Sequence, residues 1–283
     1  MYIIEKRYKE GENIKKYLFP TIFLTILICW NNIYINAQAE NYFENIGVIV
    51  TDTSMYVAPD SEALCIGKIQ KGSRVNIVSM FSEYALVNYD NQYGYLAQKD
   101  LIYDTDFETL LGKKQAYSGR NNVLITEGNL YERTVDLLMQ AYRTIPENIR
   151  MTFEKNNFRI KMTEWDIVEE AYLPYGGYWG MGKVQAVLDY EKKLIYVNDE
   201  FPNSIVHEMG HFVNNYLQMY SSRRDNKLLF YREAGKISSY AEENDREFFA
   251  EAFRLYITSP QILQMLSPDT YAMVNNAINL FSG

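Results

Sequence analysis

The stretch His-Glu-Met-Gly-His at residues 207–211 contains both histidines of the 283-residue chain. Two imidazoles four residues apart lie on the same face of a helix, so their ring nitrogens can converge on one metal ion. Glu208 then lies beside a water molecule on that ion. Asn203 or Ser204 can cap this helix, and apolar residues around much of its circumference predict that it is largely buried. The alternative is a pair of core histidines that are satisfied by backbone groups.

A catalytic zinc ion usually has three protein ligands and a water molecule. The chain has no further histidine and no cysteine in a metal-binding motif, so the third ligand must be a carboxylate. The best candidates are Glu247 and Glu251, one helical turn apart in the strongly helical stretch 245–256. One of them can bind the metal, and the other can accept the outer N–H of a ligating histidine. Spacing alone does not decide between these roles, and either residue could instead pair with an arginine at the surface.

The stretch 207–211, the pair Ser239-Tyr240 and the stretch 247–255 together resemble the catalytic domain of anthrax lethal factor and its relatives, which include secreted Pro-Pro endopeptidases. The resemblance covers residues 120–283. It implies that Glu247 is the third zinc ligand and that Glu251 supports a ligating histidine. It also implies that Tyr240 points at the metal-bound oxygen. The chain is therefore expected to be a zinc metalloendopeptidase of the gluzincin type, with one Zn²⁺ per chain bound by His207, His211 and Glu247.

The expected chemistry is hydrolysis of peptide bonds in a protein or peptide. Zinc lowers the pKa of its bound water and polarises the scissile carbonyl. Glu208 takes a proton from that water and later passes it to the leaving amine. Tyr240 donates a hydrogen bond to the oxyanion. The glycine- and aromatic-rich stretch 175–182 suggests that Tyr178 and Trp179 line the substrate cleft, and the alternative is that they pack in the core.

Upstream of the predicted peptidase domain the pattern changes. Six short β-rich stretches between residues 48 and 96, separated by turn residues, predict a small barrel. Their order resembles bacterial SH3-type domains, which often bind peptidoglycan or peptide. That family usually has an arginine and a glycine where residues 57–59 read Val-Ala-Pro, so an inherited ligand pocket does not follow. A spacer that holds the enzyme off a surface is the alternative.

The N-terminus resembles a targeting segment. Basic residues precede an apolar run at 18–30, and Ala-Gln-Ala at 37–39 supplies a cleavage site. The run is shorter than the roughly 20 residues of a membrane-spanning helix, which favours a cleaved signal peptide over an anchor. We therefore expect a bacterial protein that is secreted or at the cell surface, with no integral membrane role after cleavage.

These patterns predict an α+β protein. Its parts are a signal peptide (1–39), an SH3-type barrel (44–104), a linker (105–119) and a mainly helical peptidase domain with a short β-sheet (120–283). Within that domain we expect helices at 130–142 and 146–157, and strands at 158–162 and 194–197.

The composition and the remaining motifs limit the possible functions. The 47% hydrophobic content indicates packed structure, and the net charge of −8 speaks against nucleic acid as a partner. A second hypothesis is a cell-wall or surface binding protein with an inactive peptidase-like domain. A minority hypothesis is a toxin protease that acts on a host cytosolic protein, although no region upstream of residue 120 resembles a docking segment for translocation.

Overall fold

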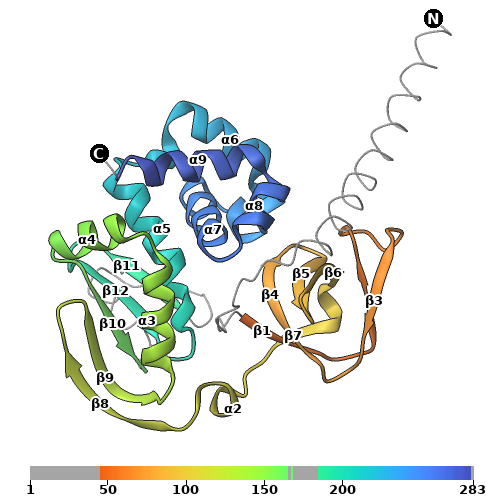
Figure 1. Cartoon of the computed structure of the whole chain (residues 1–283), viewed down its shortest axis with the longest axis horizontal. Helices are drawn as coiled ribbons and strands as arrows, with labels where there is room; N and C mark the ends of the chain where they lie inside the picture. The colour runs from red at the N-terminus through yellow and green to blue at the C-terminus, as the bar shows by residue number, and fades with distance from the viewer. Residues whose placement is uncertain (1–44, 165–166, 168–183, 282–283) are drawn as a thin grey trace, which may run out of the picture. The chain divides into compact units, whose positions relative to one another are not determined.

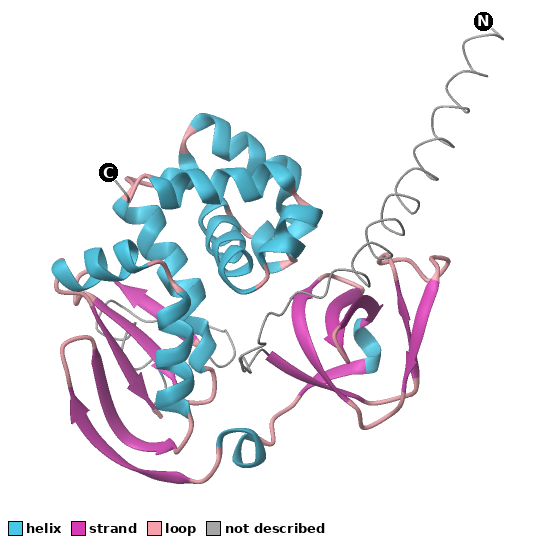
Figure 2. Cartoon of the chain, viewed as in Figure 1, coloured by secondary structure: helices cyan, strands magenta, loops and turns pink. Residues whose placement is uncertain are grey.

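The computed structural model describes residues 45–164, 167 and 184–281 (Figure 1). The signal peptide predicted at residues 1–39 lies outside this part of the chain. The chain divides into two compact units, which meet in the sequence between Tyr103 and Asp104. Strands dominate the first unit, and the second contains both strands and helices (Figure 2). The architecture is therefore α+β. No helix among the described residues is long and apolar enough to cross a membrane.

The first unit contains one antiparallel sheet with the strand order β3-β2-β6-β5-β4-β1-β7. Its strands are β1 (Asn45–Ile49), β2 (Thr53–Tyr56), β3 (Cys65–Ile69), β4 (Arg74–Met80), β5 (Tyr84–Tyr89), β6 (Gln92–Ala97) and β7 (Leu101–Tyr103), with a 3-10 turn, η1 (Gln98–Asp100), before the last. Its core consists of buried apolar side chains from these strands: Ile49, Met55, Ile69, Val75, Ile77, Ala85, Val87, Leu96 and Leu101. The six predicted strands correspond to β1–β6. The sequence missed β7, because three residues are too few to show an alternating pattern.

The closed SH3-like barrel is not confirmed. The strand order has two ends, β3 and β7, and no pairing joins these two strands in the described part of the chain. All three residues of β7 pair with β1. Closure depends on strand tilt and register, which an alternating sequence pattern does not specify. The sequence therefore predicted the strands of this unit but not their closure.

The second unit contains a five-stranded sheet with the order β11-β12-β10-β9-β8. Its strands are β8 (Lys114–Arg120), β9 (Leu124–Tyr131), β10 (Arg159–Thr163), β11 (Ala186–Asp189) and β12 (Leu194–Asn198). The two outer pairs are antiparallel, and β10 is parallel to both of its neighbours. The strands that we expected at 158–162 and 194–197 correspond to β10 and β12.

Two boundaries differ from the sequence prediction. Residues 105–119, expected to be a linker, contain α2 (Phe107–Leu111) and most of β8. Six of the seven residues of β8 are exposed, so no apolar face marks the strand in the sequence. The helix expected at 130–142 begins only at Thr134, because Leu130 is paired with Gln115 in the β9–β8 ladder.

Besides α2, the α-helices in the described part of the second unit are α3 (Thr134–Thr144), α4 (Glu147–Lys155), α5 (Ile205–Tyr216), α6 (Arg224–Ile237), α7 (Asp245–Thr258), α8 (Pro260–Leu266) and α9 (Pro268–Asn279). Helix α5 contacts β11 and β12 on one side and α7 on the other, so it lies between the sheet and the C-terminal helices (Figure 1). Gly210 allows the backbones of α5 and α7 to approach closely, because a Cβ atom there would lie 2.8 Å from Cα of Ala250. This contact brings the 207–211 stretch against the helix that carries Glu247 and Glu251.

Candidate metal centre

Helix α5 carries both histidines and Glu208, and a 3-10 turn, η4 (Pro202–Ser204), leads into it. We expected Asn203 or Ser204 to cap this helix with a side chain. Ser204 occupies the cap position, but its hydroxyl bonds Oε1 of Gln185 at 3.1 Å and no helix N–H. The backbone of Ser204 is already helical (φ −60°, ψ −16°), whereas a capping side chain usually needs an extended residue. The expected cap is therefore replaced by the 3-10 turn.

Three basic atoms from α5 and α7 face one another. Nε2 of His207 lies 3.1 Å from Nε2 of His211 and 3.1 Å from Oε2 of Glu247. Nε2 of His211 lies 3.2 Å from the same oxygen of Glu247. A proton can bridge only one of these pairs at a time, whereas a metal ion can accept a lone pair from all three atoms.

The donor set and its spacing fit zinc. A tetrahedral zinc ion with bonds of about 2.0–2.1 Å separates its ligand atoms by about 3.3–3.4 Å. The three observed separations are 3.1–3.2 Å, only slightly shorter. Two histidines and one carboxylate also leave a fourth position for water or substrate, as catalytic zinc requires.

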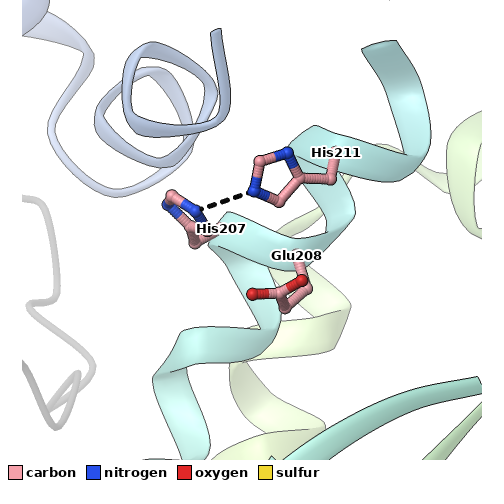
Figure 3. Close-up of side chains that lie close together, drawn as sticks. All are labelled: His207, Glu208 and His211. Carbon is pink, nitrogen blue, oxygen red and sulfur yellow. Dashed lines mark hydrogen bonds between the residues drawn. The ribbon is translucent and has the colours of Figure 1, made fainter. Parts of the chain in front are cut away.

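Glu208 lies close to the same point. A carboxylate oxygen of Glu208 and one nitrogen of each histidine lie within 4.8 Å of one another (Figure 3). By distance alone Glu208 could also be a ligand. Glu247 is the better third ligand, because its oxygen lies only 3.1–3.2 Å from the Nε2 atoms of both histidines. Glu208 is buried, and burial raises the pKa of its carboxyl, although the nearby His211 and His207 oppose this. A carboxyl of raised pKa suits proton transfer near neutral pH.

Glu251 supports His207 from the opposite side of the ring. Its Oε1 lies 2.9 Å from Nδ1 of His207. The guanidinium of Arg254 donates to both oxygens of Glu251 at 3.0 and 3.1 Å, and the hydroxyl of Ser238 donates to Oε2 at 3.2 Å. A carboxylate on the outer nitrogen fixes the tautomer that leaves Nε2 free for a metal. The geometry thus favours Glu247 as ligand and Glu251 as the group behind the histidine.

Asn244 places Glu247 at the start of α7. Its side-chain oxygen accepts hydrogen bonds from the backbone N–H groups of Arg246 at 3.0 Å and Glu247 at 3.1 Å. We expected that one of the two glutamates of α7 could pair with an arginine, and Arg254 is that partner of Glu251. The sequence did not single out Asn244 or Ser238. Asparagine directly before the helical stretch 245–256 is a recognisable capping signal. The spacing of Glu251 and Arg254 is that of a helical ion pair, but no sequence pattern marks Ser238 as a partner of Glu251, because it precedes Glu251 by 13 residues.

Tyr240 lies beside the metal ligands in a 3-10 turn, η6 (Tyr240–Glu242), just before α7. Its ring centroid is 5.6 Å from that of His207, and its side chain is partly exposed. Burial and the negative charges of Glu247, Glu243 and Glu208 raise the pKa of its hydroxyl. The hydroxyl therefore stays protonated and available as a donor. Tyr178 and Trp179, the predicted cleft residues, lie outside the described residues.

The charges of the centre favour binding of a cation. Burial would lower the pKa of His207, but its hydrogen bonds with Glu247 and Glu251 outweigh burial and raise the pKa to about 10. Burial opposes ionisation of Glu247 as well, but the hydrogen bonds from both histidines hold its pKa below the ordinary value. Without a metal the site therefore holds a proton, which a metal ion would replace.

Two histidines and one glutamate in this arrangement, with a second glutamate beside them, form a candidate metal centre of the class found in metal-dependent hydrolases. The family model described as "Anthrax toxin lethal factor, N- and C-terminal domain" matches residues 111–277. This is more than half of the chain, and the protein belongs to the anthrax lethal factor family. At the level of the family it is a metalloendopeptidase.

Among solved structures, the Pro-Pro endopeptidase (PPEP-2) from Paenibacillus alvei is similar to this chain, with a TM-score of 0.47 and 23% sequence identity. The similarity covers 54% of this chain and 96% of that one. No curated protein matches.

Proposed function

We propose that the protein is a secreted zinc endopeptidase that hydrolyses peptide bonds in a protein substrate. The observation that carries this proposal is the triangle of Nε2 of His207, Nε2 of His211 and Oε2 of Glu247, with sides of 3.1–3.2 Å and Glu208 beside it. Membership of the lethal factor family supports the reaction class. Export rests on the signal peptide predicted from the sequence.

His207, His211 and Glu247 would hold the zinc ion. When bound, zinc supplies a Lewis acid for the scissile carbonyl and makes water a nucleophile near neutral pH. Glu251 keeps the ring of His207 oriented through the 2.9 Å contact with Nδ1. The positive charge of Arg254 balances the carboxylate of Glu251, which lets this buried group stay ionised.

Glu208 moves the proton in this proposal. Its carboxylate takes a proton from the attacking water and returns it to the amine of the leaving peptide. The nearby backbone N–H of Leu188 on β11 favours the ionised form of this carboxyl and so opposes the rise of its pKa through burial. Tyr240 donates a hydrogen bond to the oxygen of the scissile carbonyl as negative charge develops there.

We further propose that the substrate binds as an extended strand along β11. Among the strands that the structure describes, β11 is at the end of the sheet order, and it contacts α5, which carries two of the proposed metal ligands. Main-chain pairing at a sheet edge binds a peptide with little demand on its sequence. Neither a Pro-Pro preference nor any other side-chain preference follows from the described residues.

The competing hypothesis is a binding protein with an inactive peptidase-like domain. A binding protein needs neither a proton carrier nor an oxyanion donor, whereas here Glu208 and Tyr240 both lie beside the proposed ligands. Peptidoglycan binding by residues 44–104 stays a proposal, since it rests on the predicted SH3-type domain. A toxin role in a host cell has no supporting feature in the described residues.

The test compares the wild type, Glu208→Ala and Glu191→Ala. Glu191 is an exposed glutamate in the turn between β11 and β12, so its variant controls for loss of one negative charge. We expect one zinc per chain in all three proteins, and peptide cleavage by the wild type and Glu191→Ala only. The proposal fails if the wild type binds zinc but cleaves nothing in a broad peptide library, or if Glu208→Ala cleaves as fast as the wild type.

A further inference from the structure

Ser238 lies at the point where α6 ends and the segment carrying Tyr240 and Glu247 begins. The residue is 2% exposed, and its extended backbone ends the helix. A serine here would ordinarily be regarded as a helix-terminating residue. Its hydroxyl, however, makes two hydrogen bonds that lead to two different parts of the proposed site.

The first hydrogen bond connects Ser238 to Glu251, the residue that supports the proposed zinc ligand His207. Oγ of Ser238 donates to Oε2 of Glu251 at 3.2 Å. Oε1 of the same carboxylate contacts Nδ1 of His207 at 2.9 Å. Glu251 therefore reaches His207 with one oxygen while Ser238 bonds the other. Loss of the Ser238 bond would remove one of the two hydrogen bonds to Oε2, the other of which comes from Arg254, and so hold the carboxylate less firmly.

The second hydrogen bond connects Ser238 to the turn that begins with Tyr240. Oγ of Ser238 accepts the backbone N–H of Ala241 at 3.0 Å. Ala241 is fully buried and is the middle residue of η6, the turn that begins with Tyr240. A buried N–H that loses its acceptor is costly, so loss of this bond would destabilise the turn.

The two bonds are chemically compatible and reinforce each other. A hydroxyl has one proton to donate and two lone pairs to accept with, so it can give its proton to Glu251 while it accepts from Ala241. An oxygen that accepts a hydrogen bond also becomes a better donor. The bond from Ser238 to Glu251 also closes a loop in the chain that contains both Tyr240 and Glu247.

We propose that Ser238 is a positioning residue that links the support of His207 to the placement of Tyr240 through one hydroxyl. The proposal rests on the zinc endopeptidase function proposed above. Ser238 touches neither metal nor substrate, and it acts through Glu251 and through the turn of Ala241. A serine that only ends a helix would affect stability alone, whereas a link between the two parts changes zinc binding and turnover together.

The experiment compares Ser238→Ala with Ser222→Ala, Glu251→Gln and the double variant Ser238→Ala/Glu251→Gln. Ser222 is a matched control, since its hydroxyl also donates to a carboxylate, that of Asp245 at 2.7 Å, but at an exposed position. The measurements are zinc affinity by chelator competition, kcat and KM on a cleaved peptide, and hydrogen exchange of the Ala241 amide.

For Ser238→Ala we expect zinc affinity and kcat each to fall about tenfold, at the lower end of effects seen behind metal ligands. KM should change by less than about twofold, because Ser238 does not contact substrate. The Ala241 amide should exchange faster. In the Glu251→Gln background, Ser238→Ala should weaken zinc binding further by less than it does alone, since both residues belong to one network. Ser222→Ala should match the wild type.

The proposal is overturned if Ser238→Ala lowers thermal stability while zinc affinity and kcat stay at wild-type values. It is also overturned if the effects of Ser238→Ala and Glu251→Gln on zinc affinity are additive. If Ser238→Ala does not fold, Ser238→Cys keeps a side chain of similar size with a weaker donor, and the same directions are expected. If the wild type cleaves no peptide, the endopeptidase function fails, and zinc affinity and Ala241 exchange still decide the role of Ser238.

Discussion

Replacing Gly210 with alanine tests whether the close approach of α5 and α7 determines the metal site. The added Cβ atom would lie 2.8 Å from Cα of Ala250, 3.1 Å from its carbonyl oxygen and 3.2 Å from Cβ of Phe253. Ordinary contact begins at 3.4 Å, so the shortest of these distances is too short by 0.6 Å (3.4 − 2.8). Two of the three atoms belong to the backbone and cannot rotate away. The two helices must therefore move apart.

Two free-energy terms of opposite sign decide the effect on stability. Alanine is favoured over glycine in a helix interior by about 1 kcal/mol. Overpacking of a well-packed core costs about 1–3 kcal/mol, and backbone contacts place this site at the upper end. We expect Gly210→Ala to lower the free energy of unfolding by about 1–2 kcal/mol. Metal sites tolerate ligand displacements of about 0.2 Å, so the separation of the helices should weaken zinc binding by at least about tenfold.

Gly235→Ala is the matched control, since Gly235 also lies inside a helix, α6. Its added Cβ atom would meet Oε1 of Glu242 at 2.9 Å, the far end of a side chain that can move. This variant should be more stable than the wild type by up to about 1 kcal/mol, with unchanged zinc affinity. Urea unfolding of the zinc-free proteins and chelator competition measure both quantities. The reasoning is refuted if Gly210→Ala is as stable as the wild type and binds zinc equally well.

Four further predictions concern the residues of the centre. Glu247→Gln should weaken zinc binding by more than the roughly 10–100-fold typical of changes behind the ligands, and an unchanged affinity in chelator competition would contradict its role as ligand. Tyr240→Phe should lower kcat about 10²–10³-fold with little change in KM, and wild-type turnover would exclude an oxyanion donor there. Asn244→Ala should lower the free energy of unfolding by about 1 kcal/mol in urea titrations, because the cap of α7 is lost; an unchanged midpoint would contradict the cap. The pKa of His207 rises from 6.5 to about 10 in the metal-free site, because the hydrogen bonds with Glu247 and Glu251 outweigh burial. The hydrogen bonds of protonated His207 therefore stabilise the metal-free fold fully below pH 6.5, and this stabilisation is lost as the pH rises towards 10. Apparent zinc affinity should increase about tenfold per pH unit over the same range, since zinc displaces the proton. A pH-independent zinc affinity would contradict this.

The sequence predicted the elements of the second unit that have a clear period, namely α3, α4, α5, α7, β10 and β12, but it did not predict α6, α8, α9, β9 or β11. The apolar positions around the 207–211 stretch and in 245–256 follow a helical repeat, and the structure has α5 and α7 there. Strand β8 was missed because its exposed residues show no apolar alternation. Closure of the first sheet could not be predicted, since it depends on register and tilt rather than on side-chain pattern.

The sequence likewise predicts only part of the candidate site. His207, Glu208 and His211 are neighbours on one helix, so their spacing alone predicts that they converge. The roles of Glu247 and Glu251 could not be separated by spacing, because both lie on the same face of α7 and only the tertiary packing decides which histidine nitrogen each one meets. The hydrogen bonds of Ser238 depend on how α6 ends against α7, and local sequence carries no signal for that contact.

Titration of zinc into the metal-free wild type, with peptide cleavage followed at each step, tests the central claim most directly. We predict that activity is absent without metal, rises in proportion to added zinc and reaches its maximum at one zinc per chain. Cleavage by the metal-free protein, or no cleavage of any library peptide at saturating zinc, would contradict the account.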